Sequence, residues 1–225
     1  SLEFDGDDYI YFQNNALDFQ GTQSKETWFK MASGASMSCY VYDESVNVNW
    51  IEAFSSNGGF YLFGTALPED GFVLQYDTWY HLADVWDVTP DGEGSRELYI
   101  NAELVASGIT PNPYSFDGDL TFGDSGPSNN WIGMQGLLHQ FRIWNKSLSL
   151  EDIQSNIQNG INEDDVDLVL YWGFNEGSGS VVNDLSDNGN YGTITNNNFT
   201  WSTDVPIPGC TDPNAINYDE TANVD

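Results

Sequence analysis

Short runs of aromatic and β-branched residues recur along residues 1–145, and Gly, Asn, Asp and Pro separate them. Many runs alternate apolar and polar positions, which is the period of a half-buried strand. The clearest runs are Tyr9–Phe12, Thr27–Met31, Ser38–Tyr42, Val46–Ile51, Gly59–Phe63, Trp79–Ala83, Glu97–Ile100 and Gln140–Trp144. Because no helical stretch intervenes, this pattern predicts an all-β domain, an antiparallel sandwich or barrel.

One stretch has the period of a helix, over residues 149–159. Its signals are an N-cap at Ser149, acidic residues in the first turn, an apolar pair at Ile153 and Ile157, and a terminating Gly160. Only one narrow stripe is apolar, so we expect one short helix that lies on the surface of the sheets.

The remainder of the chain divides at about residue 204. Residues 167–201 return to the strand pattern, with a glycine-rich turn at Glu176-Gly-Ser-Gly179. In Pro206-Ile-Pro-Gly209 two prolines fix an extended path, which is typical of a linker. We therefore expect one domain over residues 1–204, with a linker and further sequence in residues 205–225.

Composition supports a folded domain and excludes some partners. The chain of 225 residues is 40% hydrophobic and 15% aromatic, too rich in large apolar side chains for a disordered acidic chain. It has 35 acidic and 5 basic residues, a formal net charge of -30. Repulsion of phosphate excludes nucleic acid and anionic membranes as direct partners. No apolar run approaches the about 18 residues of a membrane helix, so no membrane insertion is expected.

The two cysteines, Cys39 and Cys210, form no metal or redox motif with each other or with histidine. Cys39 alternates with apolar neighbours in Met37-Ser-Cys-Tyr-Val41, which predicts a buried strand thiol.

Four segments in order resemble a known family. They are Ser1–Ile10, Thr78–Ala83, Glu97–Val105 and Gly136–Ser149. Together they are similar to the bacterial laminin-G-like jelly-roll domains of the concanavalin A-like lectin and glucanase superfamily. The resemblance implies a jelly-roll sandwich of two antiparallel sheets.

The segment Leu170–Gly192 looks like one that commonly precedes the opening strand in this family. Here it follows the jelly roll. We therefore expect the closing segment 167–201 to pack beside the first strand and to close the same sheet.

The tail Gly209–Asp225 resembles the start of a short repeat that follows linkers in large secreted bacterial surface proteins. The resemblance implies an extracellular or cell-surface module, a monomer within a larger multidomain chain. It also implies that Cys210 has lost a disulfide partner through truncation. A bridge between Cys39 and Cys210 is the alternative, if their Cα atoms lie within about 7 Å.

Calcium is the expected cofactor. Asp5-Gly-Asp-Asp8 places three carboxylates and a glycine carbonyl in one turn, and Ca²⁺ prefers about six to eight oxygen ligands. The resemblance implies a structural Ca²⁺ between the opening and closing strands. We expect ligation by the side chains of Asp5 and Asp8 and by the backbone carbonyls of Gly6 and Gln140. The alternative is an ordinary acidic turn that faces water.

A ligand-binding loop is expected at Gly123–Trp131. Asp124, Asn129 and Asn130 could bind sugar hydroxyls or Ca²⁺, and Trp131 could stack on a sugar ring. The alternative is that Trp131 begins the next strand and packs inward.

Catalysis is not expected. Glu3, Asp5 and Asp7 alternate as paired carboxylates of a glycosidase would, but they lie in the opening strand and match its non-catalytic form in the family. No nucleophile elbow, phosphate loop or dinucleotide motif occurs. The sequence therefore predicts a non-catalytic recognition or adhesion module, with a glycan or other cell-surface ligand as partner. The alternatives are a structural spacer or protein-interaction domain, and a cryptic glycanase.

Overall fold

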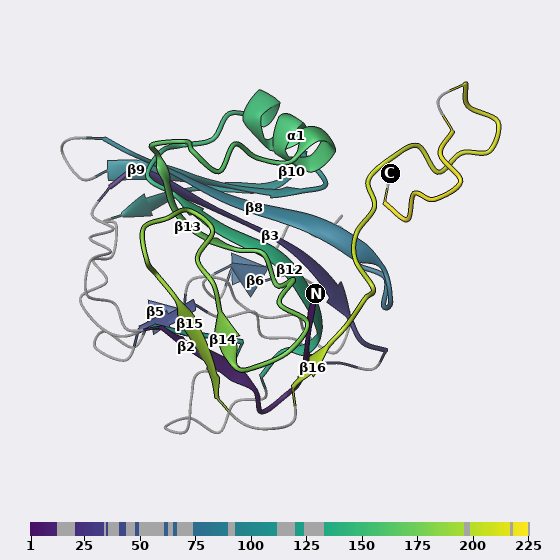
Figure 1. Cartoon of the computed structure of the whole chain (residues 1–225). Coiled ribbons are helices and arrows are strands. Elements are labelled where there is room, and N and C mark those ends of the chain that lie inside the picture. The colour runs from purple at the N-terminus through teal and green to yellow at the C-terminus, as the bar shows by residue number, and fades with distance from the viewer. Residues whose placement is uncertain are drawn as a thin grey trace.

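Two sheets of antiparallel strands face each other in the computed structural model of the chain, and one helix lies outside the larger sheet (Figure 1). The structure describes residues 1–12, 21–33, 35, 41–43, 48–49, 61–62, 65–66, 74–89, 93–111, 120–123, 133–195, 199–216 and 218–224.

The larger sheet contains eight strands. They are β1 Leu2–Asp5, β3 Gln23–Met31, β8 Trp79–Val88, β9 Glu93–Ile100, β10 Glu103–Pro111, β12 Gln135–Trp144, β13 Leu168–Trp172 and β16 Thr200–Trp201. Their order is β10-β9-β8-β3-β12-β1-β16, and β13 also pairs with β12. β1 and β13 pair with successive parts of β12, on either side of an irregularity between His139 and Arg142.

The smaller sheet contains six strands in the order β14-β15-β2-β11-β4-β5. Their bounds are β2 Tyr9–Phe12, β4 Val41–Asp43, β5 Val48–Asn49, β11 Leu120–Phe122, β14 Val181–Val182 and β15 Gly192–Thr195. A separate pair is formed by β6 Tyr61–Leu62 and β7 Thr65–Ala66. Every strand pair described is antiparallel, which confirms the predicted jelly-roll sandwich.

The main core lies between the two sheets and is rich in aromatic rings. Phe122 of the smaller sheet meets Phe141 of the larger one with ring centroids 4.4 Å apart. Trp172 contacts both rings and also Phe12. These side chains are at most 3% exposed, so the alternating apolar positions of the sequence are the residues that join the sheets.

The helix α1 Leu150–Asn159 lies on the outer face of the larger sheet, as the sequence predicts (Figure 1). Ser149 and Asp152 form a reciprocal capping box at its start. Ile153 is fully buried and packs with Val85, Trp144 and other residues of the outer face. A single apolar stripe therefore attaches the helix.

The closing segment departs from its prediction. β16 pairs with β1 and β13 pairs with β12, but β14 and β15 join the smaller sheet through β2. The expectation that segment 167–201 closes a single sheet was therefore wrong in part. The reason is that β15 pairs with β2, so that Val182 of β14 and Ile194 of β15 are buried in the core from the smaller sheet. Only β16, later in the same segment, reaches the edge of β1.

Residues 205–224, called here the C-terminal segment, fold back on themselves and contact the outer face of the larger sheet. The Asn223 side chain accepts from the Ile207 amide at 2.7 Å and donates to the Val205 carbonyl at 2.9 Å. Val224 is only 5% exposed and packs with Trp28 and Trp79. The proline-containing stretch, which the sequence marks as a linker, is thus held by side-chain and backbone contacts.

Candidate functional site

The turn between β1 and β2 gathers three carboxylates. Gly6 has a φ of 111°, a conformation that favours glycine, and it reverses the chain directly after Asp5. The Asp5 amide donates to Asp8 Oδ2 at 3.1 Å, which turns the Asp8 side chain inward. Carboxylate oxygens of Asp5, Asp7 and Asp8 lie within 4.8 Å of one another. The structure therefore brings Asp5, Gly6 and Asp8 together and adds Asp7.

One carboxylate of this turn is buried without full compensation. Asp8 is fully buried, and its Oδ1 has no hydrogen-bond partner among the described residues. The pKa of Asp8 is raised to about 6, chiefly by burial and also by the charges of Asp5 and Asp7, while the hydrogen bond from the Asp5 amide lowers it. A buried carboxylate oxygen in this state is stabilised by a bound cation or by a proton.

No basic side chain of the protein supplies that cation. The chain has 5 Lys and Arg residues, and each lies within 4.0 Å of an acidic partner elsewhere. The pairs are Lys25 and Arg96 with Asp84, Lys30 with Asp204, Arg142 with Glu26, and Lys146 with Asp165. A cation that neutralised the turn would therefore come from solution, and the all-oxygen donor set of the turn fits a hard cation such as Ca²⁺.

Gln140 does not lie with the turn. The register of β1 and β12 pairs Asp5 with Gln135, and Gln135 Nε2 donates to the Asp5 carbonyl at 3.2 Å. Pairing ends with Leu2 opposite Leu138, so Gln140 lies beyond the other end of β1. Its side-chain oxygen instead accepts from Arg142. The register of β1 on β12 decides which residue of β12 lies opposite the turn. The sequence pattern does not give this register.

The predicted ligand residues Asp124, Asn129, Asn130 and Trp131 lie outside the described residues. The two ends of their loop, however, are joined to each other and to the acidic turn. The Met134 amide donates to the Gly123 carbonyl at 2.8 Å, and the Gly133 amide donates to the Gly6 carbonyl at 2.9 Å. A Cβ atom on Gly123 would lie 2.6 Å from the Phe4 ring and 3.2 Å from the Asp8 carbonyl. The loop thus leaves and re-enters the sandwich beside the turn.

A second cluster of ionisable groups lies beneath α1. The Glu26 carboxylate accepts from Trp144 Nε1 and from Asn156 Nδ2, both at 2.9 Å. His81 Nε2 lies 3.5 Å from Glu26 Oε1, and Arg142 lies alongside. Burial raises the pKa of Glu26 and lowers the pKa of His81 well below its usual value. All three side chains are fully buried, so the cluster attaches the helix and is closed to substrate.

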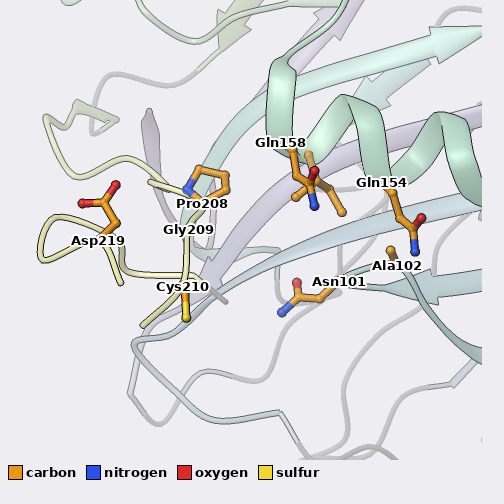
Figure 2. A pocket seen from close by; sticks show the side chains of 9 residues that line it. Asn101, Ala102, Gln154, Gln158, Pro208, Gly209, Cys210 and Asp219 are labelled. Atoms are coloured by element: carbon orange, nitrogen blue, oxygen red, sulfur yellow. The ribbon is translucent and has the colours of Figure 1, made fainter. Parts of the chain in front are cut away.

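A groove of about 720 Å³ opens on the same outer face, between α1, the turn that follows β9, and the C-terminal segment (Figure 2). Nine residues line it: Asn101, Ala102, Gln154, Ile157, Gln158, Pro208, Gly209, Cys210 and Asp219. The sequence did not indicate this groove, because its walls come from three segments far apart in the chain. Only the folded C-terminal segment brings them together.

Comparison with known proteins identifies the family to which this fold belongs. A family pattern described as the concanavalin A-like lectin/glucanases superfamily matches residues 4–154. No curated protein sequence matches the chain. A candidate carbohydrate-binding protein from Bacteroides ovatus has a similar structure, with a TM-score of 0.65, 15% identity and 91% of this chain covered. The chain spans 60% of the length of that protein.

A heptameric pentraxin, similar to serum amyloid P component, from Limulus polyphemus is also similar. The TM-score is 0.55 and the identity 15%, over 71% of this chain and 82% of the pentraxin. At these identities the likeness to solved structures shows a shared fold.

Proposed function

Because the chain belongs to the concanavalin A-like lectin/glucanase superfamily, we propose that it is a non-catalytic carbohydrate-recognition module that calcium stabilises. The fold is shared with a candidate carbohydrate-binding protein, which supports the ligand class. One observation supports placing the calcium at the acidic turn. The Asp8 carboxylate is buried and uncompensated, and all basic residues of the chain are paired elsewhere.

Calcium is held by the acidic turn in this proposal. Asp5, Asp7 and Asp8 contribute carboxylate oxygens, and the Gly6 carbonyl retains a lone pair beside its bond from the Gly133 amide. Ca²⁺ commonly completes such a set with water or ligand oxygens. The ion removes the repulsion between the carboxylates and fixes β1 relative to β2.

The sugar site lies at the same end of the sandwich. One described end of the loop that carries Asp124, Asn129, Asn130 and Trp131 is bonded to the calcium turn through Gly133 and Gly6, and the other end is bonded to the first, which supports a shared rim. A neutral glycan would bind there through hydroxyl hydrogen bonds and ring stacking. An acidic glycan would need bridging Ca²⁺, because the chain carries a net charge of -30.

The cryptic glycanase alternative is the less favoured. Of the alternating carboxylates Glu3, Asp5 and Asp7, only Asp5 and Asp7 belong to the acidic cluster, where they lie within the separation of about 5 Å that a retaining hydrolase uses. Both are exposed, whereas Asp8, the buried carboxylate of the turn, has its Oδ2 bound to the Asp5 amide and cannot reach a glycosidic oxygen. The three clustered carboxylates therefore suit an ion better than a substrate.

We also propose that the module acts outside the cell or at its surface, as one monomeric part of a larger adhesive chain. The described helix is too short to cross a membrane. The strongly acidic surface suits extracellular calcium and salt concentrations. The structural-spacer alternative makes the opposite prediction for ligand binding, because a spacer needs no glycan.

Affinity electrophoresis through gels that contain neutral or acidic polysaccharides tests the proposal. The protein should be retarded by at least one polysaccharide, and Trp131→Ala should abolish the retardation without lowering the melting temperature. A mobility that no polysaccharide changes would favour the spacer. Release of reducing ends from the gel polysaccharide, lost in Asp5→Asn, would establish the glycanase.

A further inference from the structure

The groove beside α1 is built from rigid parts. On one side stand Gln154 and Gln158, one turn apart on a capped helix. On the floor, the Asn101 amide donates to the His81 carbonyl at 2.9 Å, and the Asn101 side-chain oxygen accepts from the His81 amide at 2.8 Å. These two bonds fix Asn101 in the turn that joins β9 and β10, with its side-chain NH₂ group left to donate.

The polar groups of the groove are side-chain amides and one carboxylate. In Figure 2 the side chains of Gln154 and Gln158 extend from the helix toward the side on which Asn101 lies, and Asp219 lies on the opposite side. Asp219 is oriented by bonds from the Thr221 amide and hydroxyl to its Oδ1, at 2.9 and 2.7 Å. No Lys, Arg or His lines the groove. Amides both donate and accept, so this wall suits neutral hydroxyl groups, and the net charge of -30 disfavours anions.

Apolar atoms lie between these polar groups. Ile157, Ala102 and Pro208 contribute them from the helix, the hairpin turn and the C-terminal segment. A few convergent polar groups on a partly apolar surface suit a sugar ring, which presents C–H bonds on its face and hydroxyls at its edge. No strand edge lines the groove, so it offers no backbone ladder to an extended peptide.

We propose that this groove is a second carbohydrate site, which takes a neutral oligosaccharide between α1 and the C-terminal segment. The inference extends the proposed function and rests on it, but it does not involve the calcium turn. Its distinctive property is that the C-terminal segment forms one wall. That wall is held in place by Val224, which is buried against Trp28 and Trp79, and by the bond from Trp79 to Asp204.

Cys210 provides a reporter within the site. It is a free thiol of intermediate exposure that lines the groove. A bound oligosaccharide should shield it from alkylation. Iodoacetamide labelling of the wild-type protein, followed by peptide mass spectrometry, reads Cys210 separately from Cys39. The probes are maltotriose, cellotriose, laminaritriose and arabinotriose, with trigalacturonate as the anionic comparison.

At least one neutral trisaccharide should slow the alkylation of Cys210 by about fivefold or more at saturation, and trigalacturonate should not. Gln154→Ala and Gln158→Ala should each raise the sugar concentration that gives half of this protection by about fivefold, the loss of affinity expected for one neutral hydrogen bond. The matched control is Ser155→Ala, an exposed residue of the same helix that does not line the groove. It should leave protection unchanged.

Two further measurements of Cys210 protection separate this inference from the proposed function. Val224→Asp should lose protection although Val224 does not line the groove, and removal of calcium by a chelator should leave protection intact. If polysaccharides retard the protein but no trisaccharide slows Cys210 alkylation, the groove inference fails and the proposed function stands. If no glycan binds in either assay, both fail. Protection that requires calcium, or that survives both glutamine substitutions, would place the sugar elsewhere.

Discussion

The indole nitrogen of Trp79, near the start of β8, donates a hydrogen bond of 2.9 Å to Asp204 Oδ1. Lys30 of the neighbouring strand binds the other oxygen of the same carboxylate and lies over the Trp79 ring. These contacts stand where the chain leaves the sandwich. Together with the buried Val224, they make the C-terminal segment part of the outer surface of the larger sheet.

Val224→Asp is expected to release the C-terminal segment while the sandwich stays folded. Burial of a valine side chain contributes about 1.5–3 kcal/mol, so the open population should rise by about tenfold or more. Hydrogen exchange of the Gly209 and Asn223 amides, which are bonded within the segment, measures this opening. Ile216→Asp is the control, because Ile216 is fully exposed. Equal rates of amide hydrogen exchange in the two variants would contradict the packing of the C-terminal segment against the larger sheet.

Asn156→Ala should lower the free energy of unfolding by about 1–2 kcal/mol, because the buried Glu26 carboxylate would lose one of its two short hydrogen bonds. Ser155→Ala on the exposed side of α1 should change it by less than about 0.5 kcal/mol. Urea unfolding of both variants measures the difference. If the two variants are equally stable, Glu26 does not attach the helix.

His139 gives an expected pH dependence. Burial, with help from the N-terminal ammonium and Arg142, lowers the pKa of His139 from 6.5 to about 3. The unfolded chain therefore binds one proton more between these values, and the contribution of His139 to stability is lost as pH falls below about 6.5. Relative to His139→Asn, the wild type should lose up to about 1.4 kcal/mol per pH unit between about pH 6 and pH 4. Parallel stability curves for the two proteins would contradict this assignment.

The sandwich and its helix could be predicted because local patterns encode them. Trp28, Trp79, Trp144 and Trp172 occupy alternating strand positions, and all four are 2% exposed. The capping residue Ser149 marks the start of α1 by its own side chain. Neither signal depends on which strand is the neighbour.

Features that depend on strand neighbours could not be predicted in the same way. The pairing of Asp5 with Gln135, where the sequence suggested Gln140, follows from the register of β1 on β12. The distribution of segment 167–201 over both sheets follows from which edges remain open. The groove beside Gln154 depends on the return of Val224 to the sheet, about 70 residues further along the chain.

Calcium at saturation should raise the melting temperature by about 5 °C or more over that in chelator, as expected for about 100 times the dissociation constant. Asp8→Asn should abolish this shift. In chelator, the same variant should melt no lower than the wild type, because it removes the uncompensated buried charge. Magnesium, which requires a tighter octahedral geometry, is the ionic control. An unchanged midpoint in calcium would contradict the proposed ion site.

Carbohydrate recognition without cleavage is tested by binding of the intact protein to a glycan array in the presence of calcium. The protein should be retained on at least one neutral glycan, and the immobilised glycan should be intact after prolonged incubation. Absence of retention on every glycan, or loss of the glycan itself that Asp5→Asn prevents, would contradict this function.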